Sequence, residues 1–292
     1  MTSSPAVPPS PSAGASISGI VHALRLLLAK APQGLRQPNH SAVPYRSGRT
    51  LWATPPEADI YLPEGPGPHP SVVLVHGGGF LIGGRAMKPA VFLATQLVNS
   101  GFIVYAPSYR QVFRGGRLDE MVQDIEDAVT WWLDHRGEYG SGQQPCSLLA
   151  KSAGAPITLL AAQRFPPDTF ERFISIFGIY DLRPPPGLLS RWMARLLLKT
   201  HPKTATHKDP PLARSPLGGP AESMPLLLLH GTADRMVPYE QAQRFYERRK
   251  EQGARVRLIT YEDAEHSWFS DPDLPVCQRS VQDIVDVLKN VG

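Results

Sequence analysis

Short apolar segments alternate with amphipathic segments along most of this 292-residue chain, and this alternation constrains the fold more than any other feature. Segments such as Ser71–Val75 and Phe102–Ala106 are almost wholly apolar, which is expected of strands that are buried on both faces. Further strand candidates are Cys146–Ala150, Phe173–Phe177, Leu226–Leu229 and Val256–Tyr261. Strands that alternate with helices predict a mostly parallel central sheet with helices on both faces, which is the α/β class.

Amphipathic patterns predict the helices between these strands. Leu118–Trp132 carries apolar residues at positions 118, 121, 122, 125, 129 and 132, so one face of this helix is expected to pack on the sheet. The other helix candidates are Pro89–Asn99, Tyr239–Gln252 and Val276–Lys289. Upstream, Thr50–Leu62 is interpreted as a strand pair that two prolines interrupt, with Ala58–Leu62 as its second arm.

The composition is that of a soluble globular protein and argues against several other classes. Hydrophobic residues make up 42% of the chain and charged residues 19%, and the net charge of +4 comes without a lysine/arginine block dense enough to bind nucleic acid. Two cysteines, Cys146 and Cys277, are too few for a disulfide framework, and no Cys/His cluster suggests a metal. We therefore expect a reducing compartment, no metal and no nucleic-acid partner.

The N-terminal segment stands outside the alternation. Residues 1–16 are rich in proline, serine, alanine and glycine, and we expect them to be disordered. Ile17–Ala29 has helical spacing, and it is interpreted as a helix packed on the body, a lid over the substrate entrance or a membrane contact. Because it is too short and polar to span a bilayer, and the start lacks a positive signal region, we expect a cytoplasmic protein without stable membrane insertion.

A second segment, residues 183–223, also interrupts the alternation. It contains a triple proline, an apolar helical stripe and a further proline-rich passage. Long connections of this kind border the ligand crevice in open α/β sheets. We predict one domain over residues 17–292, with a small helical cap built from about 17–45 and 183–223; the alternative for the insert is an ordinary helix at the sheet edge.

A serine lies between a strand candidate and a helix candidate, in the sequence Ala150-Lys151-Ser152-Ala153-Gly154. A sharp strand–turn–helix elbow exposes such a serine as a nucleophile, and it needs small neighbours because strand and helix approach closely. Gly154 meets this need on one side and Ala150 on the other. The simpler alternative is a helix N-cap serine. Lys151 is expected to attract an anionic substrate group, to point to solvent or to form a structural pair.

A serine hydroxyl becomes a useful nucleophile when a histidine accepts its proton and a carboxylate orients that histidine. His266 lies in a polar loop after the strand candidate Val256–Tyr261, where such a base is needed. Asp234 ends the segment that follows another strand and is the expected acid. The chain order Ser152, Asp234, His266 is the one found in α/β-hydrolases. Two rival acids, Asp263 and Asp181, are interpreted as turn residues.

A run of glycines, His76-Gly77-Gly78-Gly79, follows the strand candidate Ser71–Val75. Consecutive glycines let backbone N–H groups turn toward one oxygen, and we expect the N–H groups of Gly78, Gly79 and Ala153 to form an oxyanion hole. His76 is interpreted as an anchor of the loop. A phosphate cradle is disfavoured because no Gly-Lys-Ser/Thr follows.

Taken together, these segments resemble the α/β-hydrolase superfamily, specifically its hormone-sensitive-lipase-like carboxylesterase branch. The similarity covers about residues 45–290 and includes, besides the segments above, the stretch Asp209–Leu217. Two positions depart from the branch, which usually has glycine at Ala150 and Ala155. The resemblance implies an α/β-hydrolase fold and cofactor-free hydrolysis of esters with acyl or alcohol groups of limited size, under a cap.

We therefore expect a serine hydrolase that cleaves small-molecule carboxylic esters with small to medium acyl or alcohol groups, through an acyl-enzyme and without a cofactor. An amidase or formamidase, or a biosynthetic acyltransferase or thioesterase, remains an alternative because each uses the same triad. A non-enzymatic ligand receptor is disfavoured, since all triad members are present. The sequence leaves the oligomeric state open.

Overall fold

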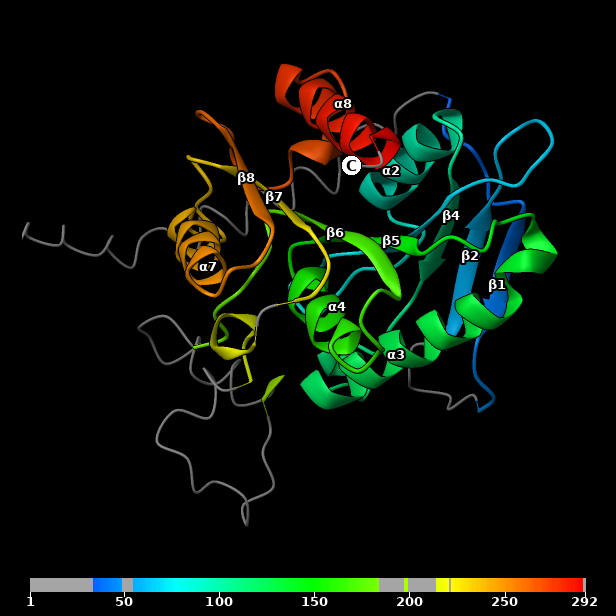
Figure 1. The fold of residues 1–292 in the computed structure, drawn as a ribbon, viewed down its shortest axis with the longest axis horizontal. Helices are drawn as coiled ribbons and strands as arrows, with labels where there is room; N and C mark the ends of the chain where they lie inside the picture. The colour runs from blue at the N-terminus through cyan, green and yellow to red at the C-terminus, as the bar shows by residue number, and fades with distance from the viewer. Residues whose placement is uncertain (1–33, 49–54, 184–196, 199–213, 221, 291–292) are drawn as a thin grey trace, which may run out of the picture.

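The computed structural model describes residues 34–48, 55–183, 197–198, 214–220 and 222–290; the grey trace in Figure 1 marks the rest. The expected disordered terminus, the helix at 17–29, most of the two cap segments and the first arm of the strand pair lie outside the described residues. The single-domain organisation with a cap therefore stays a prediction.

An eight-stranded sheet forms the centre of the described chain, in the spatial order β1-β2-β4-β3-β5-β6-β7-β8. The strands are β1 (His40–Pro44), β2 (Glu57–Tyr61), β3 (Ser71–Val75), β4 (Ile103–Pro107), β5 (Cys146–Lys151), β6 (Phe170–Ile176), β7 (Leu226–Gly231) and β8 (Val256–Tyr261). All neighbours from β4 to β8 are parallel, whereas β1 and β2 pair antiparallel. The predicted mostly parallel α/β sheet is confirmed.

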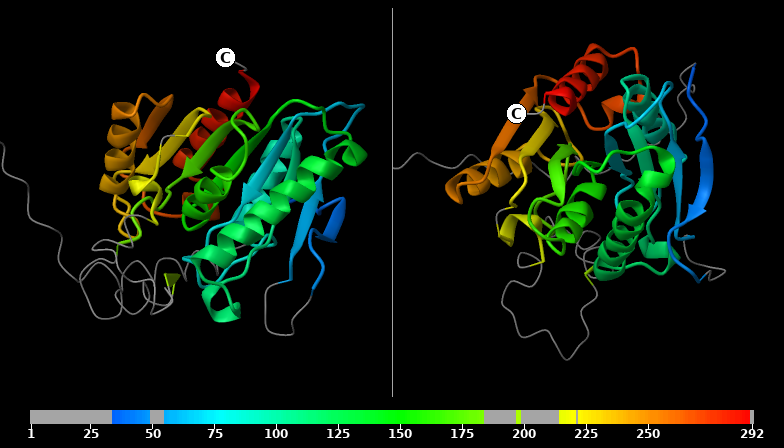
Figure 2. Two further views of the ribbon diagram at one scale, coloured as in Figure 1. Left: turned by 60° about the horizontal axis from the view of Figure 1, so that its bottom comes forward. Right: turned by 45° about the vertical axis from the view of Figure 1, so that its right-hand side comes forward.

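Helices cover both faces of this sheet (Figures 1 and 2). One face carries α3 (Leu118–His135), α4 (Gly154–Ala162) and α7 (Glu240–Glu251), and the other carries α2 (Lys88–Asn99) and α8 (Pro275–Lys289). Short 3₁₀ turns join them: η1 (Val112–Arg114), η2 (Arg136–Tyr139), η3 (Pro216–Gly218) and η4 (Trp268–Ser270). Among the described residues, no helix combines the length and the apolar composition that crossing a membrane requires.

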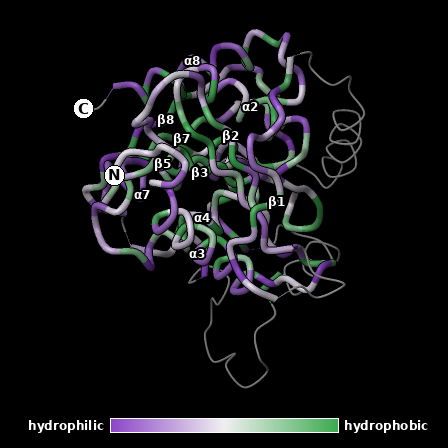
Figure 3. The backbone as a smooth tube through the Cα atoms, turned by 90° about the vertical axis from the view of Figure 1, so that its right-hand side faces the viewer, coloured by the Kyte–Doolittle hydropathy of each residue, from purple (hydrophilic) through white to green (hydrophobic). Residues whose placement is uncertain are grey.

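Two apolar clusters, one on each face, explain why the central strands are apolar throughout. On β5, Leu148 and Ala150 pack into the cluster beneath α3 and α4, while Leu149 packs into the cluster beneath α2 and α8. Successive strand residues point to opposite faces, so a strand with a cluster on each side has no polar face. Figure 3 shows the hydrophobic strands at the centre of the fold.

The edge strand β1 differs from the expectation. Residues 40–44 fall in the range assigned to the cap, yet they pair antiparallel with β2 and complete the sheet. Asp59 holds the irregular edge, since its Oδ1 accepts hydrogen bonds from the Ala42 N–H at 2.9 Å and the Ser41 hydroxyl at 3.1 Å. Four of the five β1 residues are exposed, so no apolar alternation marks this strand in the sequence.

Candidate active site

Ser152 lies in a tight turn between β5 and α4. Its φ of 49° is in the left-handed region, and its N–H donates to the Ile176 carbonyl at 2.9 Å. The start of α4 comes so close to β3 that a Cβ at Gly154 would lie 2.5 Å from the His76 carbonyl oxygen. Glycine is therefore required at 154, whereas Ala150 fits, fully buried, in the core.

The structure brings Ser152, Asp234 and His266 together from loops that follow β5, β7 and β8. His266 Nε2 is 3.1 Å from Ser152 Oγ, and His266 Nδ1 is 2.6 Å from Asp234 Oδ2. All three residues are buried, and the Phe177 ring packs against the imidazole with a centroid distance of 4.4 Å. The hydroxyl, imidazole and carboxylate thus form one continuous hydrogen-bonded chain.

The Asp234 carboxylate is strongly held in its ionised form. Its Oδ1 accepts hydrogen bonds from the N–H groups of Met236 and Val237, both at 2.9 Å. Burial alone would raise the Asp234 pKa, but hydrogen bonds from His230 and His266 outweigh it and lower the pKa to about 2. An ionised carboxylate fixes the proton of His266 on Nδ1, which leaves Nε2 free to accept the serine proton.

His230 is a partner of the acid that the sequence analysis missed. It is fully buried, and its Nε2 lies 3.3 Å from Asp234 Oδ2 and 2.8 Å from the Val237 carbonyl. The available signal was its position four residues before Asp234 at a strand end. The two rival acids do not contact the base in the described chain: Asp263 is exposed, and Asp181 pairs with Arg183.

The glycine loop lies directly against the serine elbow. A Cβ at Gly77 would lie 3.2 Å from the Ser152 Cβ, and one at Gly78 would overlap the Ile82 carbonyl. Gly78 and Gly79 have positive φ angles of 126° and 61°. Outside regular helices and strands, no hydrogen bond among the described residues uses the N–H of Gly78, Gly79 or Ala153. These three N–H groups therefore have no backbone partner in that part of the structure.

His76 anchors this loop and makes no hydrogen bond to Ser152 within the described chain. Its Nδ1 lies 2.7 Å from the Gly77 carbonyl, and its ring stacks on Tyr109 with a centroid distance of 4.3 Å. Burial lowers the pKa of His76 to about 4, so the ring is neutral at physiological pH. With its proton on Nδ1, the neutral ring donates a hydrogen bond to that carbonyl.

Lys151 is buried, so the solvent-pointing interpretation is wrong. Its Nζ lies 6.0 Å from the centroid of the Phe269 ring, and no carboxylate among the described residues pairs with it. Burial lowers the pKa of Lys151 to about 7, against a smaller opposing effect of the Cys277 thiol. Cys277 and Cys146 are both buried free thiols. Lys151 is thus a buried amine beside the η4 turn, with its ordinary preference for the charged form weakened by burial.

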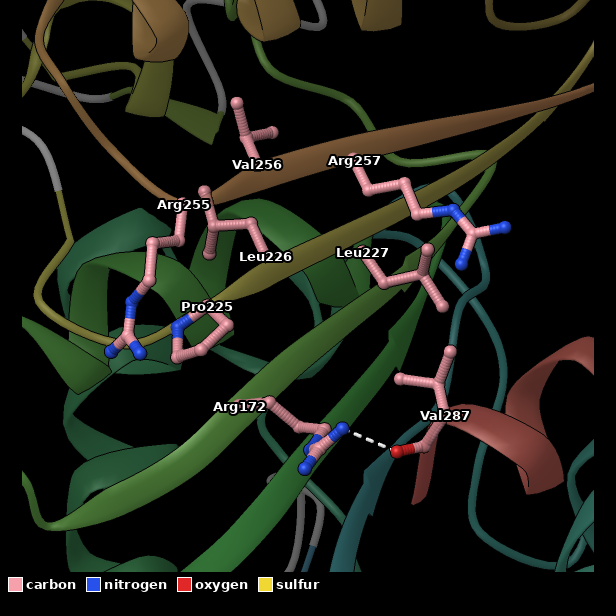
Figure 4. Close-up of a pocket in the computed structure, with 8 residues that line it drawn as sticks. All are labelled: Arg172, Pro225, Leu226, Leu227, Arg255, Val256, Arg257 and Val287. Carbon is pink, nitrogen blue, oxygen red and sulfur yellow. Dashed lines mark hydrogen bonds between the residues drawn. The ribbon is translucent and has the colours of Figure 1, made fainter. Parts of the chain in front are cut away.

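A cavity of about 360 Å³ lies elsewhere, at the opposite ends of the strands (Figure 4). Its lining includes the first residues of β7 and β8 and three arginines, Arg172, Arg255 and Arg257. The Arg172 guanidinium contacts the carbonyls of Val287 and Asn290 at the end of α8, so it caps that helix. None of the predicted site residues lines this cavity.

The described residues also contain no cluster of three or more His, Cys, Asp or Glu side chains suited to a metal.

Two family models match separate parts of the chain. Residues 58–180 match the BD-FAE model, and residues 219–273 match the Hydrolase_4 model, which is described as serine aminopeptidase, S33. The first match spans the glycine loop and the serine elbow, and the second spans Asp234 and His266.

Curated relatives are esterases by name. The probable isoprenylcysteine alpha-carbonyl methylesterase of Oryza sativa is 27% identical over 256 residues, which cover 79% of this chain and 60% of that protein. The probable carboxylic ester hydrolase LipM of Mycobacterium tuberculosis is 29% identical over 194 residues, or 61% of this chain and 44% of that protein. The chain therefore spans about half the length of the curated relatives it matches.

Solved structures show the same fold. Propionate-bound esterase 2 of Thermogutta terrifontis superposes with a TM-score of 0.70 at 24% identity, covering 90% of this chain and 98% of that one. The same esterase phosphonylated by sarin gives a TM-score of 0.70 at 22% identity, with 89% and 96% covered. The sheet order and these solved structures show an α/β-hydrolase fold, and the two family matches and the curated relatives show that the chain is similar to carboxylic ester hydrolases.

Proposed function

We propose that this chain is a serine esterase in which Ser152 is the nucleophile, His266 the general base and Asp234 the acid that orients it. The observation that carries the proposal is the hydrogen-bonded chain of 3.1 Å and 2.6 Å from hydroxyl to imidazole to carboxylate. Nucleophile, base and orienting group within hydrogen-bond reach are the geometric requirement for this chemistry.

In the first half of the reaction, Ser152 Oγ attacks the ester carbonyl carbon while His266 Nε2 takes the hydroxyl proton. The Asp234 carboxylate stabilises the resulting imidazolium. The carbonyl oxygen becomes an oxyanion, which accepts hydrogen bonds from the N–H groups of Gly78, Gly79 and Ala153. Each such donor typically stabilises the transition state by about 3 kcal/mol.

In the second half, His266 gives its proton to the leaving alcohol, which departs and leaves an acyl group on Ser152. A water molecule then loses a proton to His266 and attacks the acyl carbonyl. Collapse of the second tetrahedral intermediate releases the acid and returns the proton to Ser152 Oγ. No redox change and no cofactor enters this sequence of steps.

The proposed substrates are small-molecule carboxylic esters with acyl or alcohol groups of small to medium size, met in the cytoplasm. The printed names of the relatives support ester over amide chemistry, since they read methylesterase and carboxylic ester hydrolase. The name of the rice relative includes a methyl ester, so a small alcohol group belongs in the first panel. Formamides and thioesters complete the panel, because the same triad can act on them.

The test compares wild type with Ser152→Ala on p-nitrophenyl acetate and butyrate. We expect kcat/KM to fall by at least about 10³-fold, since the residual rate comes only from the oxyanion hole and binding. Ser147→Ala is the matched control, because Ser147 is a buried serine on β5, the strand that leads to Ser152, and its hydroxyl hydrogen-bonds Glu171. Equal rates in wild type and Ser152→Ala would remove Ser152 from the mechanism. A fluorophosphonate probe should label wild type and Ser147→Ala only.

A further inference from the structure

The end of β6 lies between β5 and β7, the strands that lead to the proposed nucleophile and to the proposed acid. The Ile176 carbonyl accepts a hydrogen bond from the Ser152 N–H at 2.9 Å. The Phe177 N–H donates to the Leu229 carbonyl of β7 at 2.7 Å. The Phe177 ring packs against the imidazole of His266, with 4.4 Å between the ring centroids. Two consecutive residues therefore contact the nucleophile, the strand before the acid, and the base.

Phe177 has an unusual backbone conformation for a residue with a large side chain. Its φ of 40° lies in the left-handed region, which glycine adopts without a steric cost. A bulky residue persists there only where the surrounding structure fixes it, and such residues cluster at functional sites. The side chain of Phe177 is also buried. A strained backbone that carries a buried ring to the base points to a role for that ring.

The Phe177 ring is supported from behind by a second aromatic side chain. The indole of Trp268 meets it edge to face, with 4.7 Å between the ring centroids and 84° between the planes. Trp268 is itself anchored to α8, because its Nε1 donates a hydrogen bond to Ser280 Oγ at 2.9 Å. The imidazole of His266 therefore packs against a ring that is held in place by the body of the fold.

The hydrogen bond to the acid fixes only one point of the His266 imidazole. That bond joins Nδ1 to Asp234 Oδ2 at 2.6 Å, and by itself it leaves the ring free to tilt. The Phe177 ring restricts this tilt, so that Nε2 stays 3.1 Å from Ser152 Oγ. Such restriction matters because a misplacement of about 1 Å in a reacting group can lower a rate by about 100-fold.

We propose that Phe177 is a positioning residue that keeps the His266 imidazole aligned for both of its proton transfers. This inference rests on the proposed function and concerns the same site. The first transfer takes the Ser152 hydroxyl proton to Nε2, and the second takes it from Nε2 to the leaving alcohol. Phe177 exchanges no proton and acts only through the imidazole. The second transfer is the more demanding one for an alkyl ester, because an alkoxide is a poor leaving group until it is protonated.

The test compares methyl butyrate with p-nitrophenyl butyrate, two esters that share an acyl group and differ in how much the leaving group needs a proton. Phe177→Leu replaces the ring with a branched apolar side chain. We expect it to lower kcat/KM by about 100-fold for methyl butyrate and by about tenfold for p-nitrophenyl butyrate, whose phenolate departs unprotonated. The loss should appear in kcat, with KM changed by no more than about twofold. Phe177→Tyr keeps the ring and should retain most of the activity toward both esters.

Phe173→Leu is the matched control, because Phe173 is a buried ring on β6 that packs into the apolar cluster on the other face of the sheet. Its ratio of the two kcat/KM values should equal that of wild type. This ratio is independent of the folded fraction of the enzyme, so a loss of stability alone cannot change it. An unchanged ratio in Phe177→Leu, with Ser152→Ala inactive, would overturn the role of Phe177 alone. Wild-type rates in Ser152→Ala would overturn the proposed function and this role together.

Discussion

His76 shows how burial changes the charge of a single side chain next to the proposed oxyanion donors. The ring is almost fully buried and stacked on Tyr109, and burial lowers its pKa to about 4. A charged imidazole here would lose its hydration without a carboxylate partner. The neutral ring instead donates a hydrogen bond from Nδ1–H to the Gly77 carbonyl and holds the loop in place.

This pKa makes folding stability depend on pH in a defined window. In the unfolded chain His76 takes up a proton below its ordinary pKa of 6.5, whereas in the folded chain it does so only near 4. The folded state is therefore destabilised as the pH falls from 6.5 to 4, by about 3 kcal/mol over that range from this group. His76→Phe keeps a ring on Tyr109 and should flatten that part of the profile.

Urea unfolding at intervals between pH 4 and 7 measures the effect. His40→Phe, which removes an exposed imidazole, should keep the wild-type slope. Parallel profiles for wild type and His76→Phe would show that His76 does not titrate as its burial requires.

At the scale of elements, the predicted strands and helices of the sheet layers are present, and their bounds differ by a few residues at most. β3 and β8 coincide with their predicted bounds, and α3 continues three residues beyond its prediction. β6 begins three residues earlier than expected, at Phe170, and ends before Phe177, which leaves the strand with a positive φ of 40°. An apolar periodicity identifies residues that face a core, and it therefore predicted these elements. The exposed edge strand β1 has no apolar pattern, so it could not be predicted in this way.

The helix α3 also carries a contact that periodicity cannot predict. Asp124 is buried, and its carboxylate binds Arg110 at 2.8 Å and Arg46 at 2.9 Å. It thereby fixes the loop after β4 that leads to η1. In the sequence Asp124 looks like one more acid on an amphipathic helix, because its two partners lie far away along the chain.

Asp124→Asn should lower the free energy of unfolding by about 3 kcal/mol, because it leaves two arginines without their buried partner. This loss is at the lower end of the range for breaking a buried ion pair, because both arginines are partly exposed to solvent. Asp127→Asn is the control: Asp127 is on the same helix and pairs with Arg46 at 2.7 Å, but it is more exposed, so a loss below about 1 kcal/mol is expected. The midpoint of urea unfolding measures both. Similar losses in the two variants would contradict a special role for Asp124.

At the scale of the whole molecule, the candidate site joins loops that are far apart in sequence. Chain order and strand ends were enough to predict that Ser152, Asp234 and His266 lie near one another, because the carboxyl ends of parallel strands share one edge of the sheet. The residues that support them, such as His230 and Phe177, could not be predicted in the same way. Their roles depend on side-chain direction inside the packed structure, which the sequence pattern does not encode.

Contacts between distant parts of the chain also accommodate the long insert between β6 and β7. Both ends of the insert are fixed to α7: Gln241 accepts hydrogen bonds from the Tyr180 and Asp181 N–H groups at 2.9 Å and 3.0 Å. At the other end Arg249, fully buried, binds the Glu222 carboxylate at 2.6 Å and the Pro216 carbonyl at 2.6 Å. One helix thus closes the insert on both sides and positions the start of β7, the strand that leads to the acid.

Arg249→Met should therefore lower the free energy of unfolding by about 3–5 kcal/mol, because the Glu222 carboxylate stays buried without its partner. Adding Glu222→Gln removes that uncompensated charge, so the double variant should be more stable than Arg249→Met alone. Arg248→Met, an exposed neighbour on the same helix, should change stability by no more than about 0.5 kcal/mol. Chemical unfolding of the four proteins measures all three effects. A double variant no more stable than Arg249→Met would mean that Arg249 acts through packing on Phe245, 4.4 Å from its guanidinium, and not through its charge.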